Sequence, residues 1–138
     1  MECVESASNV TLHASDLEIE NNTVIMMESG GNQLDIHSFH YDIKRQFFIL
    51  NFNTSLLAGK TYIVKILYTA FLKENLKGFY RSVYTDQTTG NNEYVAVTHF
   101  EPNNARKAFP CFDEPALKAN FEVKLQQLSW KPIYYFSG

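Results

Sequence analysis

The chain of 138 residues is long enough for one domain with a buried core, and its 45% hydrophobic and 14% aromatic content excludes a disordered chain. A formal charge of −3 with scattered lysines and arginines excludes the clustered basic face of a nucleic-acid-binding protein. The longest wholly apolar run, residues 47–50, is far too short to span a membrane.

The first residues, Met1 to Glu5, lack the basic and apolar regions of a signal peptide, so no targeting signal is recognised in this chain. The two cysteines, Cys3 and Cys111, have no metal-binding or redox spacing, and their separation permits a disulfide without arguing for one. We expect two free thiols, with Cys111 buried. Three Asn-x-Ser/Thr acceptors favour a secreted or luminal context and are predicted glycosylation sites: Asn9, Asn21 and Asn53.

The first half of the chain reads as short strands. Residues 10–28 alternate between apolar and polar side chains with polar interruptions, which predicts two or three strands. Residues 29–32 are Ser-Gly-Gly-Asn and predict a turn. A further strand is predicted over residues 34–41, where alternation places Ile36 and Phe39 on opposite faces.

The middle of the chain continues this pattern. Residues 46–53 form a second β-rich apolar run. Residues 61–72 have the strongest strand composition and are largely apolar on both faces, which predicts a central strand covered on both sides. Residues 79–84 and 93–100, joined by a polar turn, predict two more strands. Short strands separated by glycine turns predict an all-β fold with an antiparallel sheet or sandwich.

The segment from His99 to Pro115 follows neither a strand period nor a helix period, and it contains three prolines. Asn103 is predicted to cap a short helical turn within residues 103–108, which Pro110 then ends. Alternation resumes over residues 119–125 and predicts a last strand.

The predicted organisation has three parts. Residues 1–9 are an irregular amino terminus, residues 10–127 form one incomplete β domain, and residues 128–138 form an atypical tail. The tail contains a proline followed by four bulky apolar residues, and it does not complete the preceding strand pattern. An exposed apolar tail needs a partner surface to cover it.

No catalytic constellation is complete in this sequence. His37 and His40 fall on opposite faces of a strand and do not converge on a metal, while His13 and His99 have no neighbouring partner. There is no nucleophile elbow, phosphate-binding glycine loop or dinucleotide fingerprint. We therefore predict no metal site and no catalytic residue in this chain.

Three runs in order nevertheless carry a family resemblance. The last run contains Phe100-Glu101-Pro102, Ala105-Arg106, Ala108-Phe109-Pro110-Cys111-Phe112-Asp113-Glu114-Pro115-Ala116, Lys118-Ala119 and Phe121. The two earlier runs are Leu12-His13-Ala14-Ser15-Asp16-Leu17 and Leu76-Lys77-Gly78-Phe79-Tyr80-Arg81-Ser82-Val83-Tyr84. Together they resemble the gluzincin-type zinc aminopeptidases, the family of aminopeptidase N, the cystinyl enzyme and the endoplasmic-reticulum aminopeptidases.

The resemblance implies that residues 10–127 are the amino-terminal, saddle-like β domain of such an enzyme, without its first strands. In the family this domain packs on a zinc-containing catalytic domain and contributes a loop to the substrate cleft. Carried over by position, Glu101 resembles the acid that binds the free α-ammonium group of a peptide substrate, and His99 the residue that lines the first side-chain pocket. A carboxylate suits this role because a charge-assisted hydrogen bond selects a free amino terminus.

The remaining residues of the segment are interpreted as scaffold: Arg106, Phe109, Pro110, Cys111, Phe112, Asp113, Glu114 and Pro115. An internal ion pair between Arg106 and Asp113 is expected to hold the path that presents Glu101. Phe109 and Phe112 are predicted to be core anchors.

The departures from the family pattern define two hypotheses. The zinc-binding His-Glu-x-x-His and the Gly-x-Met-Glu-Asn motif are absent from this sequence, so no cofactor and no peptide hydrolysis are expected of this chain alone, with zinc belonging to the parent enzyme. The first hypothesis is an amino-terminal fragment of a metallo-aminopeptidase that is extracellular, at the cell surface or in the endoplasmic-reticulum lumen. Its partners are the catalytic domain and the amino terminus of a peptide. The alternative is a truncated, non-catalytic isoform that acts as an interaction module for a full-length aminopeptidase.

Overall fold

The computed structural model describes residues 1–126. This part of the chain consists of strands and loops with two short 3-10 turns and contains no α-helix, which confirms the all-β class. The elements in chain order are β1 (Ala7–His13), β2 (Glu18–Ile19), η1 (Asn21–Thr23), β3 (Ile25–Glu28), β4 (Gln33–Leu34), β5 (Ile36–Asp42), β6 (Phe47–Leu56), β7 (Tyr62–Lys65), β8 (Tyr68–Thr69), β9 (Gly78–Thr85), β10 (Asn92–His99) and η2 (Ala105–Lys107).

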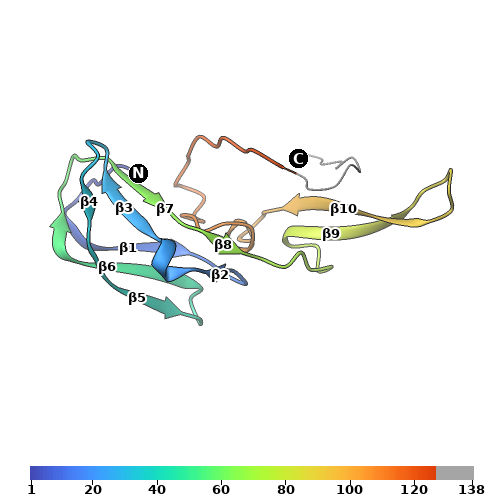
Figure 1. Cartoon of the computed structure of the whole chain (residues 1–138), viewed down its shortest axis with the longest axis horizontal. Coiled ribbons are helices and arrows are strands. Elements are labelled where there is room, and N and C mark those ends of the chain that lie inside the picture. The colour runs from blue at the N-terminus through green and yellow to red at the C-terminus, as the bar shows by residue number, and fades with distance from the viewer. Residues whose placement is uncertain (127–138) are drawn as a thin grey trace.

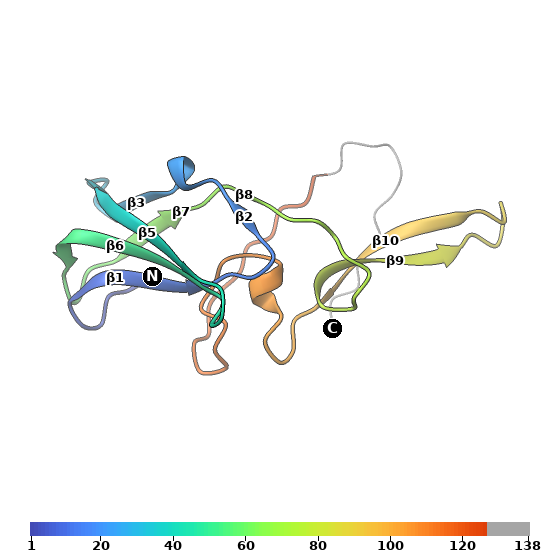
Figure 2. The ribbon, with the colours of Figure 1, turned by 90° about the horizontal axis from the view of Figure 1, so that it is seen from below.

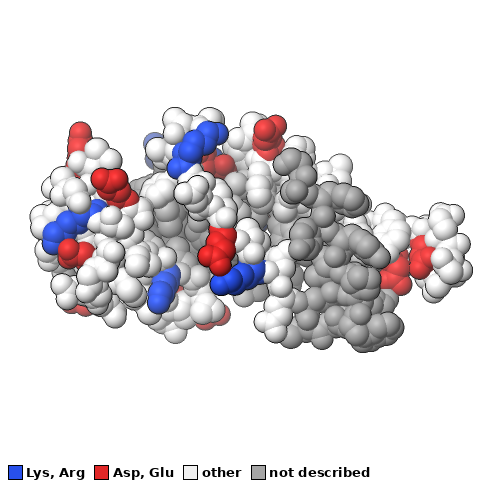
Figure 3. Space-filling model, turned by 90° about the horizontal axis from the view of Figure 1, so that it is seen from above, with Lys and Arg blue, Asp and Glu red and all other residues white. Residues whose placement is uncertain are grey.

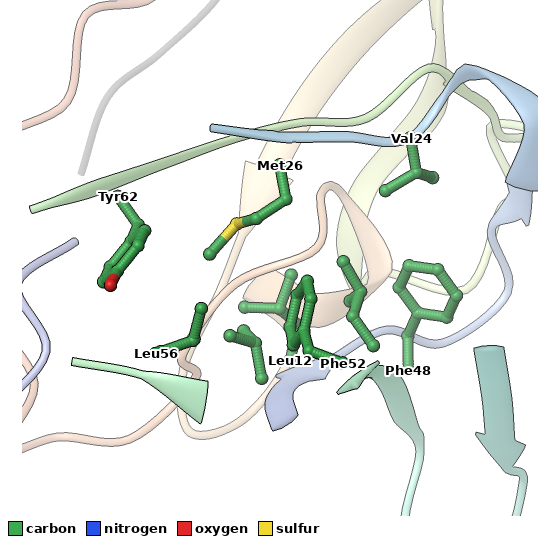
Figure 4. Close-up of a cluster of buried hydrophobic side chains, with 9 residues drawn as sticks. Leu12, Val24, Met26, Phe48, Phe52, Leu56 and Tyr62 are labelled. Carbon is green, nitrogen blue, oxygen red and sulfur yellow. The ribbon is translucent and has the colours of Figure 1, made fainter. Parts of the chain in front are cut away.

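Two three-stranded antiparallel sheets pack face to face (Figure 1). One sheet has the order β1-β6-β5 and the other has the order β4-β3-β7. Side chains from β1 and β6 point towards side chains from β3 and β7, as Figure 4 shows. The main hydrophobic core therefore lies between the two sheets, each of which buries one face.

Strand β6 supplies the centre of this core because its alternate residues are large and apolar. Phe48 and Leu50 are fully buried, whereas the intervening Ile49 and Asn51 are only half-buried. Met26 of β3, also fully buried, belongs to the same cluster. Burial of one such side chain stabilises the fold by about 1.5–3 kcal/mol.

The prediction of a central strand over residues 61–72 is wrong. That stretch divides into β7, at the edge of its sheet, and β8, which pairs with β2 in a separate two-stranded sheet. Tyr62 is buried while Ile63 is 42% exposed, so only one face of β7 is covered. Two apolar faces in a sequence do not show whether a second layer covers both of them, because the covering layer comes from elsewhere in the chain.

Strand β5 departs from simple alternation. Its register against β6 shifts between Ile36 and Ser38, which places an extra residue in β5. Ile36 and Phe39, predicted on opposite faces, therefore both pack against the core. Phe39 stacks on Phe48 with ring centroids 5.7 Å apart.

Strands β9 and β10 form a long hairpin that projects from the paired sheets (Figures 1 and 2). Their antiparallel register runs unbroken from the Gly78–His99 pair to the Thr85–Asn92 pair, which confirms the two predicted strands and the polar turn between them. The open end of the hairpin, where Gly78 pairs with His99, lies against η2, because Gly78 approaches Asn104 and Lys107.

The ends of the described chain also differ from the predictions. Strand β1 begins at Ala7, inside the stretch predicted to be irregular, and Glu2 forms a β-bridge with Thr61. Residues 119–125, predicted to be a strand, pair with no other strand within residues 1–126. The predicted tail over residues 128–138 lies outside the described residues.

Candidate functional site

A buried asparagine closes the loop between β10 and η2. Asn104 donates its backbone N–H to the Phe100 carbonyl over 2.7 Å and its side-chain Nδ2–H to the Glu101 carbonyl over 2.8 Å. Asn104 is only 6% exposed, so water competes little for these hydrogen bonds. The main chain at Glu101 is thereby held in place while its side chain is exposed to solvent.

The helical turn predicted within residues 103–108 is present as η2, but the predicted cap is wrong. Asn104 occupies the N-cap position instead of Asn103, and no side chain caps the turn. The amide of Asn104 bonds back to Glu101 because asparagine side chains readily form such local hydrogen bonds.

The expected ion pair between Arg106 and Asp113 is present and nearly buried. Arg106 Nε donates to Asp113 Oδ2 over 2.7 Å, and both side chains are about 10% exposed. The same guanidinium donates to the Asp113 carbonyl over 3.2 Å and to Gln46 Oε1 over 3.4 Å. The Arg106 carbonyl accepts a hydrogen bond from the Ser15 N–H over 2.9 Å. Arg106 therefore joins η2 to three other parts of the chain.

His13, which the sequence left without a partner, lies inside this network. It exchanges two backbone hydrogen bonds with Cys111, and its Nδ1 accepts the Asp113 N–H over 3.2 Å. Its Nε2 lies 3.6 Å from Glu114 Oε1. An accepting Nδ1 assigns the neutral ring to the tautomer with its proton on Nε2, directed towards Glu114. Burial, with the charge of Arg106 as the next cause, lowers the pKa of His13 below its ordinary value of 6.5.

This lowered pKa predicts weaker folding in mild acid. The unfolded chain binds the His13 proton more readily than the folded chain, so the stabilisation is complete above pH 6.5 and is lost as the pH falls below that value. We expect the urea midpoint of the wild-type chain to fall between pH 7 and pH 5. His13→Asn, which keeps an acceptor near Nδ1, should flatten that slope. An equal slope in wild type and His13→Asn would contradict the assignment.

A second ionic cluster joins the base of the hairpin to the sheets. Asp16 accepts from Lys73 Nζ over 2.9 Å and from Lys107 Nζ over 3.1 Å. The hydrogen bond from Lys73 is the largest cause that lowers the pKa of Asp16. Asp16 is one of the polar interruptions between the predicted strands of residues 10–28, and it stands in the first of the three family-like runs.

Gly78 packs directly on η2. Its φ is +72°, and a Cβ at this position would lie 2.6 Å from the Lys107 Cβ and 3.1 Å from the Asn104 carbonyl oxygen. Only a glycine allows both this backbone conformation and this close approach. Because Gly78 has no side chain, the first residue of β9 can pack directly against η2 and the carbonyl oxygen of the buried Asn104.

The two predicted substrate-contacting residues lie two positions apart and are both exposed. His99 ends β10, and its Nδ1 is 3.1 Å from the Leu76 carbonyl oxygen. Glu101 follows in the loop, and within residues 1–126 its carboxylate forms no hydrogen bond or ion pair.

Figure 3 shows that positive and negative side chains are interspersed on one face of the molecule.

The aromatic residues of the segment divide into two groups. Phe109 lies against Phe100 and Phe121, with ring centroids 5.6 and 5.8 Å away. Phe112 is 41% exposed, so its predicted role as a core anchor is wrong. The backbone of Cys111 pairs with that of His13. Neighbouring side chains of an extended segment point in opposite directions, so the Phe112 side chain points away from the side on which Cys111 lies.

Both cysteines are free thiols, as predicted. Cys111 is half-buried, and this burial, supplemented by the charge of Asp113, raises the pKa of its thiol to about 11. Such a thiol is protonated at neutral pH and is a poor nucleophile. The three glycosylation acceptors, Asn9, Asn21 and Asn53, are exposed. Their glycosylation remains a prediction.

These features define an all-β domain that holds one free carboxylate on a braced loop. A family model described as the peptidase M1 N-terminal domain matches residues 1–133, and the chain belongs to this family. It is 39% identical over 127 residues to endoplasmic reticulum aminopeptidase 1 of Rattus norvegicus, covering 89% of this chain and 13% of that protein.

Two further relatives give the same picture. Membrane alanyl aminopeptidase of Manduca sexta is 33% identical over 126 residues, which is 88% of this chain and 12% of that protein. The thyrotropin-releasing hormone-degrading ectoenzyme of Homo sapiens is 35% identical over 124 residues, 90% of this chain and 11% of that protein. The chain thus spans between 11% and 13% of the length of these three relatives.

The zinc ion that the resemblance implies has no ligand set in the described residues. Within residues 1–126, no group of three His, Cys, Asp or Glu side chains is placed to hold a metal ion, whereas zinc sites need three or four convergent ligands. These residues do not fit a zinc ion, and we assign no step of metal chemistry to them. No helix in the same part of the chain is long and apolar enough to cross a membrane.

Proposed function

We propose that this chain forms the amino-terminal β domain of a zinc metallo-aminopeptidase and that Glu101 binds the free α-ammonium group of the peptide substrate. The observation that carries this proposal is the combination of a fixed backbone with a free carboxylate. Asn104 holds the Glu101 main chain by its 2.8 Å hydrogen bond, while the side chain is exposed. Because the main chain is already held, binding restricts only the Glu101 side chain, and the charge-assisted bond offsets that cost.

His99 is proposed to line the pocket for the first side chain of the substrate. It is exposed at the end of β10, two residues from Glu101, and its ring is oriented by the contact with the Leu76 carbonyl. An exposed histidine beside a carboxylate presents an aromatic edge and a polar nitrogen to the same ligand. This arrangement suits a residue that adjusts specificity while Glu101 fixes the amino terminus.

The proposed partner of this domain is a catalytic domain that supplies the zinc site. Exposed apolar side chains on the projecting hairpin favour such a partner: Val83 is 45% exposed, Tyr84 41% and Tyr94 63%. A two-stranded hairpin alone is marginally stable in water, so a covering surface is favourable. The location proposed for the parent enzyme is the cell surface or the endoplasmic-reticulum lumen, in agreement with the names of the relatives.

Substitution of Glu101 tests the proposed role. In an M1 aminopeptidase whose own amino-terminal segment is replaced by residues 1–133, we expect Glu101→Gln to weaken binding of free-amino substrates by about 10–100-fold, since a hydrogen bond to a charged group is worth about 1.5–3 kcal/mol. The measurement is KM for an aminoacyl substrate together with inhibition by an amino-acid amide and by its N-acetylated form. Wild type should prefer the free amine, and Glu101→Gln should lose that preference.

The matched control is Glu18→Gln, which neutralises an exposed carboxylate on β2 and should change neither constant. An unchanged preference in Glu101→Gln would refute the anchoring role. The parent-enzyme proposal has its own test in the transcript of the parent locus. An in-frame His-Glu-x-x-His supports it, and a locus that lacks the motif refutes it.

A further inference from the structure

The imidazole ring of His99 makes one directed contact at the end of β10. Its Nδ1 lies 3.1 Å from the Leu76 carbonyl oxygen. A carbonyl oxygen only accepts hydrogen bonds, so Nδ1 has to be the donor in this contact. In the neutral ring the hydrogen then belongs to Nδ1, and Nε2 is left as an acceptor.

The carbonyl that fixes this tautomer belongs to a braced loop. The loop between β8 and β9 carries Leu76 and lies at the open end of the hairpin (Figures 1 and 2). Arg81 donates its backbone N–H to the Lys73 carbonyl over 3.1 Å, and its Nε lies 2.9 Å from Glu74 Oε1. Lys73 Nζ in turn pairs with Asp16 over 2.9 Å. These contacts tie the loop to β9 and to the turn between β1 and β2, so the acceptor for His99 Nδ1 is held in place.

The second ring nitrogen is open to a ligand. His99 is exposed, and within residues 1–126 its Nε2 forms no hydrogen bond or ion pair. Glu101, two residues further on, presents a carboxylate that also only accepts. The amide of Asn104 is already used by the Glu101 carbonyl, and Lys77 lines a small cavity beside Asp16. The exposed polar groups at positions 99 and 101 are therefore both acceptors.

We propose that His99 selects peptides whose first side chain donates a hydrogen bond, such as the amide of glutamine, over side chains of equal size that only accept. This selection rests on the pocket role proposed for His99 and names the substrate class of that pocket. A donor pairs with Nε2, whereas a side chain that only accepts leaves Nε2 without a partner after both groups have lost their water. An acidic first side chain has acceptors alone, and the Glu101 carboxylate repels it further.

The test compares two first residues that differ chiefly in donor capacity. Glutamine and the γ-methyl ester of glutamic acid are matched in length and uncharged, but only glutamine donates. In the M1 aminopeptidase that carries residues 1–133, the ratio of kcat/KM for the glutamine substrate over the ester substrate should fall about 3–10-fold in His99→Phe, because one neutral hydrogen bond is lost. Phenylalanine keeps a flat ring without nitrogens. His37→Phe, a change of an exposed histidine on β5, is the control and should leave the ratio unchanged.

The tautomer has its own measurement in the full 138-residue chain. The nitrogen chemical shifts of the His99 ring at about pH 8, where free histidine is neutral, distinguish the nitrogen that carries hydrogen from the one that does not. We expect the hydrogen on Nδ1, with the signals assigned by their absence in His99→Phe. A hydrogen on Nε2 alone, or on both nitrogens, would overturn the proposal whatever the kinetics show.

The kinetic outcomes separate the selection from the pocket role on which it rests. If His99→Phe changes kcat/KM among apolar first residues but leaves the glutamine-to-ester ratio unchanged, His99 lines the pocket and the proposed selection is wrong. If His99→Phe changes kcat/KM for no substrate, His99 does not line the pocket, and both proposals fail. The loss of free-amine preference in Glu101→Gln is a separate measurement and is unaffected by either result.

Discussion

Arg106→Ala is expected to lower the free energy of unfolding by about 3–5 kcal/mol, because removal of one partner leaves the other charge buried without compensation. Arg106 is 8% exposed and donates four hydrogen bonds, two to the Asp113 carboxylate, one to the Asp113 carbonyl and one to Gln46. One of these four bonds uses the backbone N–H and survives the substitution, so the loss comes from the guanidinium. The measurement is urea unfolding followed by circular dichroism.

The matched control is Arg45→Ala, which removes the ion pair with Asp42. Arg45 Nη1 lies 2.8 Å from Asp42 Oδ2, a geometry close to that of the buried pair, but the Arg45 side chain is 71% exposed. We expect a loss of about 0–1 kcal/mol there. Arg106→Ala combined with Asp113→Ala should cost less than the sum of the two single changes. Equal small losses at both arginines would show that burial does not determine the contribution of the pair.

Gly78→Ala is expected to cost about 2–5 kcal/mol, from about 1–2 kcal/mol for a left-handed alanine and about 1–3 kcal/mol for overpacking. The added Cβ would lie 2.6 Å from the Lys107 Cβ, so η2 has to move. Because η2 follows directly after the loop that holds Glu101, the substitution should also weaken substrate binding in the enzyme described above.

Gly90→Ala provides a close control for this change. Its φ is +71° against +72° for Gly78, but nothing lies within 4 Å of the position that its Cβ would take. Gly90→Ala should therefore show the conformational cost of about 1–2 kcal/mol without the overpacking cost. The difference between the two thermal unfolding experiments measures the contact between β9 and η2. Equal losses would mean that this contact does not brace the loop.

Local sequence patterns predicted the elements whose conformation depends on near neighbours. The hairpin was predictable because β9 and β10 alternate around a polar turn and pair with each other. The segment from His99 to Pro115 was identified because its prolines exclude a regular period, and the Arg106–Asp113 pair was expected because charged side chains in an aromatic-rich turn are usually paired. The residues named for substrate contact remain proposals.

Predictions failed where a distant part of the chain determines the environment. The stretch over residues 61–72 was apolar on both faces, yet within residues 1–126 β7 lies at the edge of its sheet and exposes Ile63 on its second face. Phe112 was expected in the core and is exposed, because the backbone pairing of Cys111 with His13 sets the direction of the neighbouring side chains. Neither outcome has a local signal in the sequence.

The sequence by itself determined the all-β class, the family and the segment that presents Glu101, since these depend on composition, alternation and a specific order of residues. Only the tertiary structure decided which residues support that segment. His13 contacts Asp113 across 100 residues of sequence, and Lys107 contacts Asp16 across 91. Such contacts form because the packing of the sheets and the hairpin brings distant residues together, and one-dimensional periodicity carries no record of that packing.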